Sequence, residues 1–566
     1  MNPTRQAITA LTLTALTLAG STRAQSALRP ALEPPDVKIE APAVTAPPES
    51  FFKLMEDRMG NPRRRGSRRR AADQAENQKA AGEQVAQELA IYRKFYKKYI
   101  DVKGLPVAAH ADVSDLALQR TYDIVTHMLA GRPDVLQAMV SNRTYLIIIG
   151  KNQVYTDMPE YRNSPNPEFL NERVRGTGGN PTSFGEENLL CLAIDRYDDE
   201  SIGVHEFCHT IDGTLRSIDP AWSQRLDSVY RHATDNGLWK YAYAASNPGE
   251  YWAETCQSYF DCGRANNWNH GPVSRREQLR VYDPMCYELC RSVFNLAPDQ
   301  DWRYAWLQKL PMVSAPPTTP MFKNLDPWYT KFTWAREFTV VGRGASDEAL
   351  LHANATIRRM FAYRHDILKA LIAEGVKLVV LGPNESIADL PEYKKLTDKS
   401  KVDHTLRYFT YIPEMKLLVV AQENVLADPR DTYVGDNQVI RVFADALYRV
   451  AGLRPAVPGY RGDQQYELRV KRLDVGFDQA VTALYDKAKA ANKWKGTSAV
   501  EDKFAYWTAG VLAYFDALGQ DAPAPEAPCA INTREALKTY DADLFALVNE
   551  TMAYEGHVDW RYTAHR

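Results

Sequence analysis

The sequence predicts an α+β fold that is used twice along the chain, and three observations support this prediction. The chain has 566 residues, which is too long for one ordinary hydrophobic core. Residues 107–161 align without a gap on residues 339–393, and both segments end in Pro-Glu-Tyr. In each segment a long helical pattern leads into a short apolar strand, so each copy is expected to combine a small sheet with helices.

The internal repeat continues beyond these segments in the same order. EYWAETCQSYFD at 250–261 aligns with AYWTAGVLAYFD at 505–516, and two shorter blocks recur further on. Blocks that recur in one order indicate a duplicated domain. We therefore expect copies at 92–310 and 327–566, joined by a proline-rich linker at 311–326.

Each copy is expected to contain two short apolar strands before a mainly helical part. The first strand is TYLIIIG at 144–150 in copy one and VKLVVLG at 376–382 in copy two. The second strand is expected at NLLCLAI, 188–194, and at KLLVVAQ, 416–422. These runs are short and apolar, which favours buried strands.

The N-terminal part is expected to lie outside both copies. Arg5 precedes the apolar run AITALTLTALTLAG, and small residues follow, so residues 1–24 resemble a signal peptide that is cut after Ala24. Residues 25–91 are predicted to be a linker, first rich in proline and alanine and then basic, that leads into a helix. A signal peptide predicts a secreted or periplasmic protein, in which the seven cysteines are candidates for disulfides of undetermined pairing.

Composition limits the partners. The hydrophobic content is 45% and the formal net charge is -2, which gives no general attraction to nucleic acid or to a membrane surface. After the signal peptide no apolar run is long enough to span a bilayer, so no integral membrane segment is expected. The basic stretch NPRRRGSRRR at 61–70 is interpreted either as a solvated linker or as an arm that contacts polyanions of the cell envelope.

The chemistry is expected in copy one, at the stretch HEFCH. His205 and His209 are one helical turn apart, so both imidazoles can reach one metal ion. Glu206 would then lie beside the open coordination position, where a carboxylate accepts a proton from water. The motif alone occurs by chance often enough that further ligands are needed.

Downstream residues predict the rest of the site. No histidine follows at the spacing of a metzincin, which excludes that class. NPGEYWAETCQSYF places Glu250 and Glu254 one turn apart on a second helix. We expect Glu250 to be the third zinc ligand and Glu254 to hold a ligand imidazole. Both glutamates lie among the aromatic residues Tyr251, Trp252 and Phe260, and a carboxylate buried among aromatic side chains is costly unless it binds a partner such as a metal or an imidazole.

Two stretches, HEFCHTID and YAASNPGEYWAE, resemble those of the anthrax lethal factor-like zinc peptidases, a gluzincin family. This resemblance implies a zincin-like, catalytic fold for copy one, and the internal repeat extends the zincin-like fold to copy two, so that two tandem zincin-like domains are expected. It also implies that Tyr243 stabilises the oxyanion of the reaction and that Asp212 and Asn247 support the metal ligands. Cys208 stands where the family usually has glycine, and we expect it to pack in the core.

Two neighbouring segments are candidates for substrate contact. By analogy with zincins, a peptide is expected to add as a strand to an edge of the sheet, at SFGEENLLCLAI, 183–194. The glycine-rich stretch 176–185 is interpreted either as a mobile flap or as a surface loop.

Copy two lacks the proposed site residues. The repeat aligns His205, Glu206, His209, Glu250 and Glu254 with Arg441, Val442, Asp445, Ala505 and Ala509. The aromatic residues around them are kept, so the lost residues do something other than hold the fold. Copy two is therefore interpreted as a degenerate, non-catalytic domain.

The sequence as a whole predicts an exported zinc endopeptidase that acts on a protein or peptide substrate. Zn²⁺ is expected on His205, His209 and Glu250, with Glu206 as the base and Tyr243 as a hydrogen-bond donor. Two alternatives stay open. One is an exported, non-catalytic binding protein with a structural metal, and the other is a zinc amidase that acts on cell-wall peptides.

Overall fold

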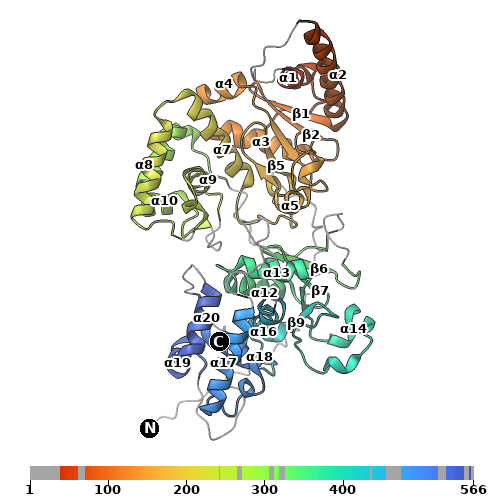
Figure 1. The fold of residues 1–566 in the computed structure, drawn as a ribbon, viewed down its shortest axis with the longest axis vertical. Coiled ribbons are helices and arrows are strands. Elements are labelled where there is room, and N and C mark those ends of the chain that lie inside the picture. Colours follow the sequence, from red (N-terminus) through yellow and green to blue (C-terminus); the bar gives the residue numbers. More distant parts are fainter. Residues whose placement is uncertain are drawn as a thin grey trace, which may run out of the picture.

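The computed structural model describes most of the chain. The described residues are 39–60, 71–240, 242–263, 270–304, 312–317, 325–433, 436–453, 473, 475–519, 531–553 and 560–562. The predicted signal peptide at 1–24, the basic stretch 61–70 and part of the predicted linker 311–326 lie outside them. The structure is mixed α+β with two sheets, in agreement with the predicted class (Figure 1). In the described residues no helix is both long enough and apolar enough to cross a membrane.

The first sheet has five strands in the order β1-β2-β3-β5-β4. They are β1 (Tyr96–Val102), β2 (Leu105–His110), β3 (Leu146–Ile149), β4 (Gly176–Thr177) and β5 (Thr182–Gly185). β3 is parallel to both β2 and β5, and all four of its side chains are buried. Ile148 packs into the main core of this half, whereas Ile147 packs on the other face against N-terminal residues. Both faces of the strand are thus covered, which explains its continuous apolar sequence.

Helices cover this sheet and extend beyond it. They are α1 (Glu49–Met59), α2 (Ala71–Phe95), α3 (Asp115–Met128), α4 (Pro133–Ser141), α5 (Pro167–Arg173), α6 (Glu186–Leu189), α7 (Ile202–Ile218), α8 (Trp222–Asp235), α9 (Pro248–Tyr259), α10 (Arg276–Tyr282) and α11 (Pro284–Phe294). Short 3₁₀ turns are η1 (Tyr155–Asp157), η2 (Tyr243–Ala245) and η4 (Pro298–Gln300). α7 and α9 pack closely, and the Trp252 indole donates to the Cys208 carbonyl at 2.9 Å. This contact joins the two helices that carry the predicted ligands.

The structure differs from the predicted linker at residues 49–59, which form the packed helix α1. Phe51, Phe52 and Met55 of this helix are buried, and the ring of Phe51 meets those of Tyr96 and Tyr145 edge-on. The reason is geometric, because α1 covers the sheet face that the helices of the main core leave open. A few apolar residues beside a long proline-rich stretch are too weak a pattern to predict this.

The second predicted strand of copy one is also wrong. Residues 188–194 are not a strand, because β5 ends at Gly185 and the short helix α6 follows it. The buried side chain of Asn188 causes the change of direction. It donates to Asp195 at 2.9 Å and accepts from the Ile202 amide at 2.7 Å, so it holds a compact turn ahead of α7. A short apolar run does not distinguish such a turn from a strand.

The second sheet has four strands in the order β6-β7-β8-β9. They are β6 (Lys331–Ala335), β7 (Phe338–Gly342), β8 (Lys377–Leu381) and β9 (Leu417–Ala421), so both strands predicted for copy two are confirmed. The helices are α12 (Asp347–Met360), α13 (His365–Glu374), α14 (Pro391–Lys395), α15 (Gln422–Val425), α16 (Gln438–Leu447), α17 (Val475–Ala490), α18 (Lys503–Tyr514), α19 (Arg534–Tyr540) and α20 (Ala542–Ala553). Short turns are η6 (Ile387–Asp389), η7 (Lys399–Lys401), η8 (Tyr448–Gly452) and η10 (Ser498–Val500).

The two halves share buried hydrogen bonds as well as sequence. In each half a buried aspartate accepts hydrogen bonds from one tryptophan indole and one tyrosine hydroxyl. These residues are Trp239, Tyr251 and Asp283 in the first half and Trp494, Tyr506 and Asp541 in the second. The Asn188–Asp195 bond likewise recurs between Asn424 and Asp431, at the same distance of 2.9 Å. The repeated residues therefore occupy repeated positions.

The two halves lie one above the other along the long axis of the molecule (Figure 1). An ion pair joins them. Arg358 of α12, which is 3% exposed, donates to both carboxylate oxygens of Asp198 at 3.0 and 2.7 Å. Asp198 lies in the segment that leads into α7, so the second half contacts the first close to the predicted site.

Candidate metal centre

Helix caps position the predicted metal ligands. α7 begins after Ser201, whose side chain caps the first turn, and the helix presents His205 and His209 one turn apart. α9 begins after Asn247, whose side chain accepts a hydrogen bond from the Glu250 amide at 3.0 Å. The cap thus fixes Glu250 in the first turn of α9. This is where the structure places Asn247, which supports the ligand through the backbone.

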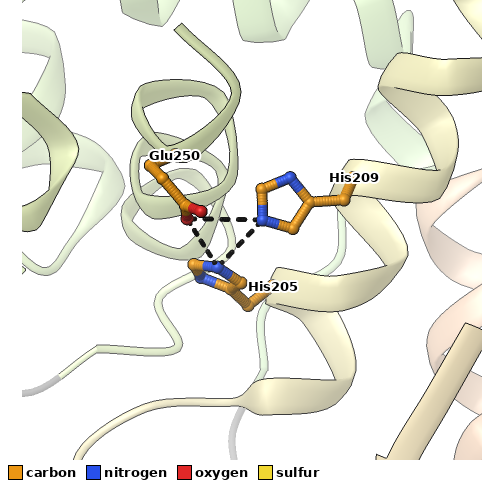
Figure 2. Close-up of side chains that lie close together, drawn as sticks. All are labelled: His205, His209 and Glu250. Atoms are coloured by element: carbon orange, nitrogen blue, oxygen red, sulfur yellow. Dashed lines mark hydrogen bonds and ion pairs between the residues drawn. The ribbon is translucent and has the colours of Figure 1, made fainter. Parts of the chain in front are cut away.

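The three predicted ligand atoms converge between the two helices (Figure 2). The Nε2 atoms of His205 and His209 are 3.1 Å apart. Glu250 Oε2 lies 3.2 Å from Nε2 of His205 and 3.4 Å from Nε2 of His209. The atoms form a nearly equilateral triangle.

The triangle fits a zinc ion. Ligand atoms about 2.0–2.1 Å from one tetrahedral zinc lie about 3.3–3.4 Å from each other, close to the three observed separations. The chemistry of the donors agrees, because two imidazole nitrogens and one carboxylate are a common zinc ligand set. Lone pairs that face one another across about 3 Å repel unless a proton or a cation lies between them, and one metal ion at the centre would satisfy all three atoms at once. His205, His209 and Glu250 are therefore the residues that would hold the metal.

The pKa values reflect this crowding of charge. Burial alone would raise the pKa of Glu250, but hydrogen bonds to His205 and His209 outweigh it and lower the pKa well below its usual range. Burial raises the pKa of the neighbouring Glu206 carboxyl, although both histidines oppose the shift. A carboxylate with a raised pKa is a better proton acceptor, as a general base requires.

The glycine-rich stretch 176–185 packs directly against α7. A Cβ atom at Gly178 would lie 2.4 Å from the Cβ atom of His209, and one at Gly176 would lie 3.0 Å from Cγ of Glu206. Thr210 fastens the stretch, because its hydroxyl accepts a hydrogen bond from the Gly179 amide at 3.1 Å. The structure therefore shows a packed wall of the site and not a detached surface loop.

The edge of the sheet lies one strand further out than predicted. β5, which contains Ser183 and Phe184, is an interior strand between β3 and β4. β4 (Gly176–Thr177) pairs with β5 in antiparallel register and forms the edge next to α7. A peptide that added to this sheet near the metal centre would therefore pair with β4, because the residues 183–194 are covered.

Tyr243 lies at the start of η2, four residues before the cap of α9. Its side chain is 42% exposed, so it is accessible to a bound molecule. Burial of part of the ring and the charge of Glu250 raise the pKa of Tyr243, which keeps its hydroxyl protonated as a hydrogen-bond donor. This position suits the donor role that the sequence predicts.

Of the two carboxylates predicted to support the metal ligands, Glu254 lies beside a ligand and Asp212 does not. Glu254 Oε1 lies 3.4 Å from Nδ1 of His205, which is an ion-pair distance, whereas the hydrogen bond at Nδ1 is with Gln257. Asp212 instead accepts hydrogen bonds from Trp222 at 2.6 Å and from Arg216 at 3.0 Å, so it joins α7 to α8. Among the described residues the hydrogen-bond partners of the Asp212 carboxylate are therefore Trp222 and Arg216, and the predicted contact with a metal ligand is not among these contacts.

Among the described residues six cysteines are present and none of them forms a disulfide. Cys208 is fully buried in the main core, which agrees with the expected packing role. Its thiol is therefore a small apolar group on the side of α7 that faces the core.

Three residues of the site were not predicted from the sequence. Gln257 Oε1 lies 3.2 Å from Nδ1 of His205, and its amide nitrogen donates to Glu200 at 3.0 Å. His270 lies 2.6 Å from Glu254. Gln257 follows Glu254 by three positions and so shares its helix face, which is a usable signal. His270 is brought in from a separate segment and has no such signal.

In the second half, the charged residues at the positions of the two histidines form ion pairs with neighbouring side chains. Arg441, at the position of His205, forms an ion pair with Asp436, and Asp445, at the position of His209, pairs with Arg449 at 2.8 Å. Ala505 stands at the position of Glu250. Among the described residues, both clusters that are able to hold a metal ion belong to the first half.

Comparison with known proteins adds no name to this geometry, since no protein-family model and no curated protein matches the chain.

Proposed function

We propose that the protein is a zinc-dependent endopeptidase of the gluzincin type. The single observation that carries the proposal is the triangle of His205, His209 and Glu250 with separations of 3.1–3.4 Å. Glu206 follows the first ligand directly, and a partly exposed Tyr243 lies at the start of the turn before α9. The proximity of these residues supports a site in which two histidines and a glutamate hold the metal, Glu206 is the base and Tyr243 is the donor.

Each residue has a distinct role in this proposal. When bound, zinc supplies Lewis acidity, which polarises a carbonyl oxygen and makes a water molecule more acidic. Glu206 accepts the proton of the attacking water and passes it to the leaving amine. The Tyr243 hydroxyl donates a hydrogen bond to the oxygen that becomes negative as the carbonyl is attacked. Glu254 and Gln257 hold His205 from its Nδ1 side.

A peptide substrate suits the surroundings of the site. β4 is an edge strand beside α7, and an extended peptide can add to such an edge through backbone hydrogen bonds. On this proposal both halves are zincin-like, and the second is a degenerate copy without catalysis. We further propose that residues 1–24 are a signal peptide and that the protein acts outside the cytoplasm.

A purely structural metal is less well supported. A closed structural zinc site uses four protein ligands, and cysteine is the usual fourth. In the described residues three ligand atoms converge, while Cys208 faces the core. A site with three protein ligands leaves one position for water or substrate, as in catalytic centres. A zinc amidase that acts on cell-wall peptides shares this site and differs only in substrate.

The test combines metal analysis with substrate profiling. Native mass spectrometry of the purified protein should show one zinc ion, and a peptide library should be cleaved at defined bonds. Glu206→Gln should keep the zinc and lower kcat about 10²–10⁴-fold, because it removes the base and keeps the shape. Bound zinc without Glu206-dependent cleavage of any peptide would overturn the peptidase proposal, and cleavage confined to cell-wall cross-links would favour the amidase.

A further inference from the structure

A second buried polar cluster lies behind His205, on the side away from the metal position. His270 Nδ1 is 2.6 Å from Glu254 Oε2, and His270 Nε2 is 3.4 Å from Glu200 Oε1. Glu200 and Glu254 are 5% and 3% exposed. Burying a carboxylate costs free energy unless it is paired, so each of these two glutamates is expected to need a partner that offsets the cost.

The cluster is not suited to a second metal ion, although its atoms lie close enough together. Two ligand atoms of one zinc lie about 3.3–3.4 Å apart, whereas the 2.6 Å between His270 and Glu254 is the length of a charge-assisted hydrogen bond. Both ring nitrogens of His270 also face carboxylates, so the ring bridges them. The cluster is therefore an imidazole between two carboxylates.

The cluster closes into a ring that includes the metal ligand. Glu254 connects His270 to Nδ1 of His205 at 3.4 Å. Gln257 connects Glu200 to the same Nδ1 atom, with distances of 3.0 and 3.2 Å. Both routes from Glu200 therefore end on Nδ1 of His205. Nδ1 carries a proton when it faces two acceptors, which leaves Nε2 free for a metal.

Charge explains why a histidine is needed between the glutamates. Burial would lower the pKa of His270, but the carboxylates of Glu200 and Glu254 outweigh it and raise the pKa to about 10. The ring is then an imidazolium that donates to both carboxylates. Without it two buried like charges would face each other, and Glu254 would lose the partner that holds it beside His205.

The second half lacks this ring together with the ligands. Ala509 and Leu512 of α18 stand at the positions of Glu254 and Gln257 of α9. Both α9 and α18 are nevertheless intact helices. Asp436, at the position of Glu200, instead pairs with Arg441. The fold therefore does not require the ring, whereas the half with metal ligands has it.

We propose that His270 is a positioning residue of the metal centre: it clamps Glu254 and Glu200 so that His205 presents Nε2 to the metal. The proposal rests on the proposed zinc site. It assigns to His270 an effect on metal affinity and ligand geometry, which is measured separately from any effect on the stability of the half.

The test is zinc affinity, measured by competition with a chelator, for His270→Leu and His270→Gln. His270→Leu should weaken zinc binding about 10–100-fold, as expected for loss of an outer partner of a ligand. His270→Gln should recover part of the loss, because its amide still donates to one carboxylate. The visible spectrum of the Co²⁺-loaded protein should change in position or intensity in His270→Leu. Circular dichroism would show that both variants are folded.

His232→Leu is the matched control, because His232 is exposed on α8 of the same half. It should leave zinc affinity and the Co²⁺ spectrum unchanged. Folded His270→Leu with wild-type affinity and spectrum would overturn the role of His270 and leave the zinc site standing. A wild-type protein that binds no zinc would overturn the proposed function itself, so the two failures are distinguishable. If His270→Leu does not fold, unchanged affinity in His270→Gln and in Gln257→Leu overturns the role.

Discussion

The helix pairs α7–α9 and α16–α18 show one scaffold with and without a cluster of candidate metal ligands among the described residues. In both pairs a tryptophan indole donates to a carbonyl of the first helix, Trp252 to Cys208 and Trp507 to Ala444. In the first pair the side-chain atoms of His205, His209 and Glu250 converge as candidate metal ligands. In the second pair Arg441 supplies the positive charge as a side chain. The packing of the helices is thus independent of the chemistry between them.

The comparison also separates supporting residues from site residues. The cap of the second helix is present in both halves, as Asn247 and as Asp502, and each accepts from the amide three residues further on. The cap therefore belongs to the scaffold, although it places Glu250. Glu254 and Gln257 are absent from the second half, so they belong to the metal centre.

The most severe test is to give the first half the residues of the second. His205→Arg, His209→Asp, Gly213→Arg and Glu250→Ala together should abolish zinc binding and peptide cleavage, because both imidazoles and the Glu250 carboxylate are removed and the new aspartate is expected to pair with the new arginine. Gly213→Arg is included because Arg449, at this position, pairs with Asp445 in the second half. Metal analysis and circular dichroism measure the outcome. A protein that loses its fold along with its metal would show that the scaffold depends on the site after all.

A smaller effect is expected at the proposed oxyanion donor. Tyr243→Phe should lower kcat/KM about 10²–10³-fold with unchanged zinc content, because it removes one donor to the developing charge. Ser498 begins η10, as Tyr243 begins η2, and serves as the control. Ser498→Ala should leave kcat/KM unchanged. Equal effects of the two substitutions, or none at Tyr243, would contradict the assignment of the donor.

The smallest effect concerns the glycines around α7. Gly178→Ala should lower the free energy of unfolding of the zinc-free protein by about 1–3 kcal/mol, because its Cβ atom would lie 2.4 Å from Cβ of His209. Gly213→Ala should instead raise it by about 0.5–1 kcal/mol, since no atom lies within 4 Å of the new methyl group on the helix. Urea denaturation compares the two. If the Gly178→Ala protein is as stable as the wild type, the stretch 176–185 can shift away from α7 without a measurable cost in free energy.

The sequence predicted the part of the site that follows helical spacing. His205, Glu206 and His209 lie within one turn, and Glu250 and Glu254 lie within another, so local geometry was sufficient. The class of fold and the strands of the second half followed from the repeat and from apolar runs. Each of these predictions depended on residues close together in the chain.

The features that were missed depend on contacts between distant segments. α1 is a helix because Phe51 and Phe52 cover an open sheet face, which is a tertiary reason. Residues 188–194 turn away from the sheet because of the buried amide of Asn188. His270 reaches Glu254 from outside any helix, with no periodic pattern to indicate it.

The ion pair between Arg358 and Asp198 changes how the molecule can be divided. Asp198 precedes Glu200 by two residues, and Glu200 is part of the ring behind His205. The second half therefore contacts the first beside the candidate metal centre, and a chain that ends within 311–326 would lack Arg358 and its ion pair with the Asp198 carboxylate. The second half thus supplies the first with a buried counter-charge next to the candidate site.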